Sequence, residues 1–118
     1  MAWEKASPEM MALLADALSE YDCASRKMFG STAYFVNSNM FAGVLGSHIM
    51  LRMGEADREE IFAQYGDEAV VAPMGRRMRE YVSVPHEVSD DPAALDDWLR
   101  RGYDFAASLP PKEKKGKR

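Results

Sequence analysis

Apolar residues recur at steps of three and four near the start of the chain, which is the period of a helix with one buried face. Ser7 can cap such a helix, Pro8 is favoured at its first position, and Glu9 suits the positive end of the helix dipole. The pattern therefore predicts a helix that begins near residue 8. Its apolar stripe is Met10, Leu13, Leu14, Ala17, Leu18 and Tyr21.

From residue 26 the helical period gives way to short runs rich in β-branched and aromatic residues. In the last run Ile49, Leu51 and Met53 face one side, and the even-numbered residues face the other. Runs this close in sequence pair as an antiparallel meander. The predicted strands are 26–29, 32–36, 40–45 and 48–53, with turns at 37–39 and 46–47.

The second half of the chain predicts a helix, two more strands and a final helix. The first of these helices covers 55–65 and stops at Gly66, and the strands cover 69–73 and 78–84. Asp90 or Asp91 caps the last helix, which Pro110-Pro111 terminates. One face of this helix is apolar, formed by Leu95, Trp98, Leu99, Gly102, Phe105, Ala106 and Leu109.

This order of elements predicts an α+β fold, because the strands run consecutively and the helices are segregated from them. We expect an antiparallel sheet, a meander of about four strands plus two more, packed with three helices. A chain of 118 residues makes one domain with its own core. We place this domain at 1–109 and expect a disordered basic tail at 110–118, which has no apolar side chain to bury.

The composition of the chain indicates the cellular compartment in which the protein works. A single cysteine excludes an intramolecular disulfide. The N-terminus lacks the apolar core of a signal peptide, and no apolar run approaches the roughly 20 residues of a membrane span. We expect a cytoplasmic protein that does not bind membranes.

Charge is unevenly distributed along the chain. Residues 112–118 hold five bases and one acid, a net charge of +4. Since the whole chain carries −4, residues 1–111 carry −8. An acidic body repels phosphate backbones at long range. We therefore expect nucleic-acid binding to be weak at most and mediated by the tail.

No catalytic, cofactor or metal site is expected from the motifs. No serine lies in a nucleophile elbow, no glycine run ends in the Lys-Ser or Lys-Thr of a phosphate loop, and His48 and His86 match no metal-ligand spacing. Cys23 is best interpreted as a small hydrophobic residue, although a pairing with either histidine in three dimensions stays conceivable. We expect a non-enzymatic protein.

Basic residues gather in two predicted strands. If those strands are neighbours in the sheet, they form a positive patch that suits a nucleic-acid backbone or an acidic protein surface. The alternative, which we favour, is that the arginines pair with acids such as Glu80 and Asp67. The candidate patch is Arg26, Lys27, Arg76, Arg77 and Arg79.

One series of motifs is distinctive. It consists of Arg26-Lys27-Met28-Phe29-Gly30, Tyr34-Phe35-Val36, Met40-Phe41-Ala42, the Ile49–Met53 strand, the run from Tyr81 to Val88, and the helix start from Asp91 to Trp98. In order and spacing this series resembles the N-terminal domain of the TfoX (Sxy) competence regulators, over roughly residues 9 to 108. The resemblance implies a compact α+β domain of the YjbR-like kind and a role in bacterial regulation of DNA-uptake genes, through protein contacts.

Full-length members of that family carry a second, helical domain, whereas only Pro110–Arg118 follow here, so we expect a stand-alone version. Phe29 and Phe41 are expected to anchor the sheet on the helices.

The first hypothesis is a regulatory module that binds a protein partner, whose identity the sequence leaves open. A nucleic-acid-associated protein and a small-molecule-binding domain are the alternatives, and a dimer is left open.

Overall fold

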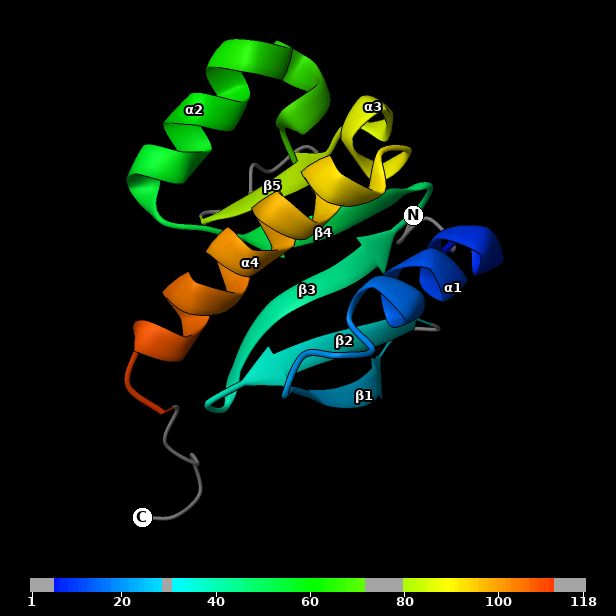
Figure 1. The fold of residues 1–118 in the computed structure, drawn as a ribbon, viewed down its shortest axis with the longest axis vertical. Helices are drawn as coiled ribbons and strands as arrows, with labels where there is room; N and C mark the ends of the chain where they lie inside the picture. The colour runs from blue at the N-terminus through cyan, green and yellow to red at the C-terminus, as the bar shows by residue number, and fades with distance from the viewer. Residues whose placement is uncertain (1–5, 29–30, 72–79, 112–118) are drawn as a thin grey trace.

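The computed structural model describes residues 6–28, 31–71 and 80–111 (Figure 1). Five strands form one antiparallel sheet in the order β1-β2-β3-β4-β5, so each strand pairs with the next along the chain. The strands are β1 (Ala24–Met28), β2 (Ser31–Val36), β3 (Asn39–Leu45), β4 (His48–Arg52) and β5 (Tyr81–Val84). The helices are α1 (Pro8–Ala17), α2 (Glu55–Tyr65), the 3-10 turn η1 (Gly66–Ala69), α3 (His86–Ser89) and α4 (Pro92–Ser108).

The predicted α+β class and the four-stranded meander are confirmed. Asn37 and Ser38 both adopt positive φ, which gives the tight two-residue turn between β2 and β3, and Gly46 (φ 61°) does the same between β3 and β4. Helix α2 has the predicted bounds and ends at Gly66, whose φ of 61° suits a helix stop.

The caps read from the sequence also form. The Ser7 hydroxyl accepts a hydrogen bond from the Met10 N–H (3.2 Å), and the Asp91 carboxylate accepts from Ala93 and Ala94. Asp91, rather than Asp90, is therefore the cap of α4. Among the described residues, no helix is long and apolar enough to cross a membrane.

Two features differ from the sequence prediction. The strand expected at 69–73 is absent over its described part, because Ala69 ends the 3-10 turn and only Val70 bridges to Val82. The short helix α3 was not predicted; four residues are too few for a periodic pattern to show. Residues 72–73, 78–79 and 112–118, on which other predictions fall, lie outside the described residues, as does Phe29.

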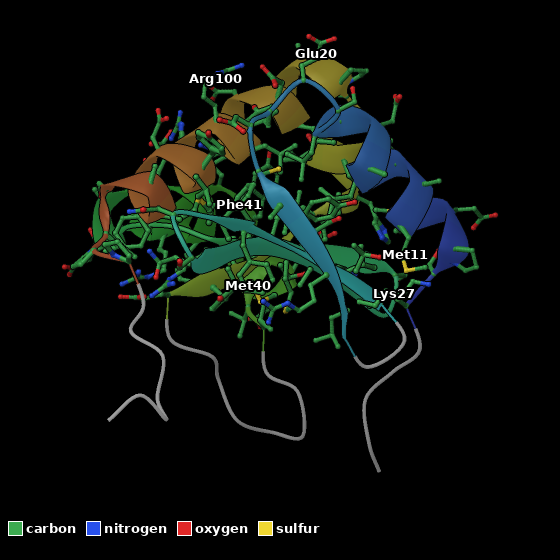
Figure 2. All side chains as sticks on the ribbon, turned by 90° about the horizontal axis from the view of Figure 1, so that it is seen from below. Met11, Glu20, Lys27, Met40, Phe41 and Arg100 are labelled. Atoms are coloured by element: carbon green, nitrogen blue, oxygen red, sulfur yellow. The ribbon has the colours of Figure 1, made fainter. Side chains whose placement is uncertain are left out.

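The core lies between the sheet and helices α1 and α4, which cover one face of it (Figure 1). A bulge in β3 places Phe41 between Met40, opposite Phe35, and Ala42, opposite Tyr34. In Figure 2, Phe41 points to the helix side of the sheet and Met40 to the other face. Phe41 is fully buried, as predicted for an anchor of the sheet.

Helix α4 approaches the sheet most closely at Gly102. A Cβ built there would lie 2.6 Å from Cδ1 of Leu51 and 2.7 Å from the carbonyl oxygen of Arg52. The second atom belongs to the backbone of β4, which cannot move without disturbing the sheet. Glycine is therefore required here by space rather than by backbone conformation. Leu95, Trp98, Leu99 and Ala106 on the same face are all buried, as the stripe predicted.

Gly102→Ala is expected to destabilise the protein by about 1–3 kcal/mol, because the added methyl overpacks the contact with β4. At an exposed helix position the same change stabilises by up to about 1 kcal/mol. Urea unfolding of Asp104→Ala and Asp104→Gly supplies the matched control at an exposed site of α4. A Gly102→Ala protein as stable as the wild type would show that α4 does not pack this closely.

Candidate functional site

Strand β1 forms an open edge of the sheet. It pairs only with β2, and no other strand of the described residues lies outside it. Its residues from Ala24 to Lys27 are exposed. An edge strand presents unpaired backbone N–H and C=O groups, so it can accept a further strand. Figure 2 shows β1 along the near edge of the sheet.

Basic and aromatic side chains accompany this edge. The guanidinium carbon of Arg26 lies 5.1 Å from the centre of the Phe35 ring, across the β1–β2 pair. Lys27 is the next residue of β1 and is paired with Thr32 of β2. Its side chain therefore points to the opposite face of the sheet from that of Arg26. The edge therefore offers a positive charge on each side of β1.

An open hollow adjoins the same edge. It is lined by the chain from Asp22 to Arg26, by residues 35–38 at the β2–β3 turn, and by Tyr103 and Ala107 of α4. Tyr103 holds the wall together, since its hydroxyl donates to the Asp22 carbonyl oxygen (2.9 Å). The hollow is thus built by α4 and the strand edge jointly.

Asparagines of the β2–β3 turn tie this region to the end of α4. The Asn39 amide, in a side chain that is buried, donates to the carbonyl oxygens of Ala106 (3.4 Å) and Pro110 (3.1 Å). Asn37 donates to the Leu109 carbonyl oxygen (2.8 Å). These bonds tie the β2–β3 turn to the C-terminal end of α4, and they hold the hollow's wall in position.

The candidate basic patch is described only in part. Arg26 and Lys27 lie on β1, while Arg76, Arg77 and Arg79 fall outside the described residues. The patch required its two strands to be neighbours; β1 and β5 (Tyr81–Val84) lie at opposite edges of the sheet, and the patch itself stays a prediction because residues 76–79 are not described. Glu80, one of the acids expected to pair with these arginines, accepts from Arg52 (2.8 Å).

Cys23 and the histidines lie at opposite ends of β3. Cys23 precedes β1 beside the β2–β3 turn, whereas His48 pairs with Leu45 at the other end of β3. That strand spans about 20 Å, at roughly 3.3 Å per residue. Burial, and to a smaller extent the charge of Asp22, raises the pKa of the Cys23 thiol. A protonated thiol without a nearby base is not an activated nucleophile.

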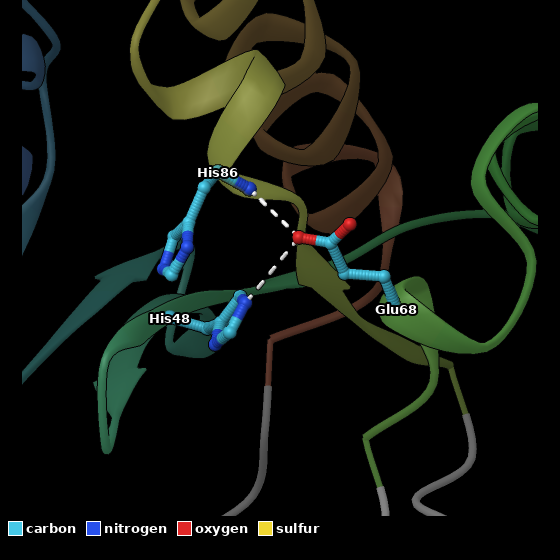
Figure 3. Close-up of side chains that lie close together, drawn as sticks. All are labelled: His48, Glu68 and His86. Atoms are coloured by element: carbon cyan, nitrogen blue, oxygen red, sulfur yellow. Dashed lines mark hydrogen bonds and ion pairs between the residues drawn. The ribbon is translucent and has the colours of Figure 1, made fainter.

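Both histidines meet Glu68 at the far end of the sheet (Figure 3). The two imidazole rings are stacked, with centres 4.0 Å apart and planes 9° apart. One carboxylate oxygen of Glu68 lies 3.6 Å from Nε2 of His48 and accepts the backbone N–H of His86 (3.1 Å). Spacing along the chain, from which no metal site was expected, does not show that side chains from β4, η1 and α3 lie together.

Comparison with known protein families matches residues 12–106 to the TfoX N-terminal domain. The chain belongs to this family. The matched range covers most of the 118 residues and agrees with the resemblance read from the motifs. A search of curated proteins finds no match. Both ends of the sheet described above fall within this TfoX N-terminal domain.

The Cys23 thiol of this TfoX N-terminal domain is expected to react with iodoacetamide more slowly in the folded protein than in the denatured chain near pH 7.5, because its raised pKa leaves less thiolate. The rate should keep rising with pH beyond the range in which the denatured chain levels off. Asp22→Asn should raise the folded rate by removing a charge that opposes thiolate formation. A folded protein that reacts faster than the denatured chain would contradict this.

Proposed function

We propose that this TfoX N-terminal domain is a non-enzymatic regulatory module that acts by binding a protein partner at the β1 edge. The observation that carries the proposal is the open edge itself, exposed from Ala24 to Lys27 and flanked by a hollow. The family supplies the setting, so bacterial control of DNA-uptake genes in the cytoplasm is the first process in which to look for the partner.

The edge favours a partner segment of defined chemistry. A segment in extended conformation can pair its backbone with β1, while alternate side chains point to the two faces of the sheet. On one face it meets Arg26 above the Phe35 ring, which suits an acidic side chain. Around the edge it meets the hollow beside Tyr103, which has room for a larger side chain. We therefore propose an extended, acidic segment of another protein.

Nucleic-acid binding is less well supported as the function. Of the candidate basic residues, only Arg26 and Lys27 lie in the described part of the chain, and residues 1–111 carry a net −8. An acidic body opposes association with phosphates. Capture of nucleic acid is therefore the competing outcome of the crosslinking experiment.

A photo-crosslinking residue in place of Lys27, in the source cell, should capture a protein that the same residue in place of Arg100 does not capture. Both positions are exposed, but only the first lies on the edge. Arg26→Glu should weaken the interaction by at least about 10-fold, because it reverses the charge that meets the acidic segment.

Arg100→Glu is the matched control. Arg100 is also an exposed arginine over an aromatic ring, with its guanidinium carbon 5.0 Å from the centre of Tyr21. Equal capture at both positions, or an interaction that Arg26→Glu leaves intact, would refute the β1 interface. Capture of nucleic acid through Lys27, with an affinity that falls steeply with salt, would replace this proposal by the nucleic-acid alternative.

A further inference from the structure

We propose that His48, Glu68 and His86 form a binding site for a first-row transition-metal ion of the zinc class. One ligand atom from each residue lies within 4.8 Å of the other two. The site lies at the end of the sheet away from the Cys23 hollow, so it is separate from the proposed β1 interface.

The fold brings the three ligands together through strand pairing. Ile49 of β4 pairs with Val84 of β5, so the preceding residue of one strand, His48, lies beside the residues that follow the other, Pro85 and His86. The 3-10 turn that carries Glu68 is held against β5, because Ala69 is fully buried and Val70 bridges to Val82. The site is therefore supported by the sheet rather than by a loop.

Hydrogen bonds leave one nitrogen of each histidine free for an ion. Nε2 of His86 lies 2.8 Å from the Ser47 carbonyl oxygen, and a carbonyl can only accept, so this nitrogen carries a proton and in the neutral ring Nδ1 keeps its lone pair. A histidine ligand that donates its other ring N–H to a backbone carbonyl is the usual arrangement in metal sites. For His48, Nδ1 lies 3.4 Å from the Ser47 hydroxyl, and Nε2 faces Glu68.

Nε2 of His48 is the observation that points most directly to a ligand. It is the one buried side-chain nitrogen or oxygen in the described part of the chain that has no hydrogen-bond partner. Its 3.6 Å separation from the Glu68 oxygen is too long for a hydrogen bond. A buried polar atom without a hydrogen-bond partner is costly, and in the tautomer that leaves Nε2 unprotonated its lone pair faces the negative carboxylate. A cation between them removes both penalties.

The donor set selects the class of ion. Two imidazoles and one carboxylate suit zinc, nickel, cobalt and copper, whereas calcium and magnesium require oxygen ligands. Zinc holds such ligands at about 2.0–2.2 Å, so ligand atoms around it lie about 3.4 Å apart, close to the separation of His48 and Glu68 here. The parallel rings must tilt so that their lone pairs converge, which the exposed His86 and half-exposed His48 have room to do. Three protein ligands leave a fourth position open for water.

The composition of the chain makes a metal-binding test specific for this site. His48 and His86 are the only histidines, and Cys23 is the only cysteine. With the purification tag removed, any histidine-dependent binding must therefore arise at this site. Calorimetric titration with zinc at about pH 7.5 should give one ion per chain, and cobalt should give the visible absorption of a tetrahedral complex.

His48→Ala and His86→Ala should each lower the zinc affinity at least about 10-fold, and Glu68→Gln should lower it too. Glu87→Gln, an exposed carboxylate next to His86, and Cys23→Ser should leave it unchanged. Binding should weaken between about pH 7.5 and about pH 5.5, because histidine must be neutral to bind a metal. Thermal melting without metal verifies that each variant folds.

NMR of the wild-type chain provides a readout that needs no variant. One equivalent of zinc should shift the ring C–H signals of both histidines together, and magnesium should shift neither. Absence of zinc binding, binding that survives loss of either histidine, or movement of only one histidine would each overturn the proposal. None of these results bears on the β1 interface, so the two proposals fail independently.

Discussion

The direct contact of α4 with β4 at Gly102 determines where the remaining parts of the domain can lie. Because Gly102 has no side chain, the helix lies directly against the Leu51 side chain and the Arg52 carbonyl, and its neighbours Leu99 and Ala106 are buried in the core. Further along, Tyr103 reaches the segment before β1 and Ala107 reaches the hollow. On its outer side, Arg101 forms ion pairs with Asp57 and Glu60 of α2. One helix thus holds both the strand edge and the second helix.

This arrangement separates the sheet into regions with different exposure. Strands β3 and β4 pack against α1 and α4, and Val82 and Val84 of β5 are buried in the same core. The pairing of β4 with β5 positions the two histidines at one end. Strand β1 lies outside this core and contributes exposed residues. A rigid centre with an open edge is the form expected of a binding module, since the centre fixes the geometry of an interface that the edge provides.

Much of the fold could be predicted because local chemistry decides it. Ser7, Gly66 and Pro92 mark helix ends by cap or backbone preference, and the alternation around Ile49 and Leu51 matches the two faces of β4. The strand predicted at 69–73 is wrong over its described part, 69–71, because Ala69 and Val71 are buried by a turn and a single bridge rather than by a strand. A high β-propensity indicates that such residues are buried, but it does not show whether they are buried by pairing with a neighbouring strand.

The candidate site was harder to predict, for reasons of geometry. The β1 residues Arg26 and Lys27 stood out by charge, but their edge position depends on the strand order. The cluster of His48 and His86 depends on the pairing of Ile49 with Val84, and Glu68 carries no local signal that distinguishes it from neighbouring acids. If the pairing of β5 with β4 had been known, the sequence would have predicted that the two histidines are neighbours. It would not have predicted that the Glu68 carboxylate lies beside them.

Native-state hydrogen exchange of the isolated domain tests most directly the claim that α4 holds the centre of the sheet while β1 remains an open edge. Amides of β4 and of the middle of α4 should exchange only through global unfolding. In β1, amides that bond to β2 should be protected, and the alternate, outward-facing amides should exchange rapidly. Protection of every β1 amide to the level of β4 would mean that another copy or segment already covers the edge, and would contradict the account.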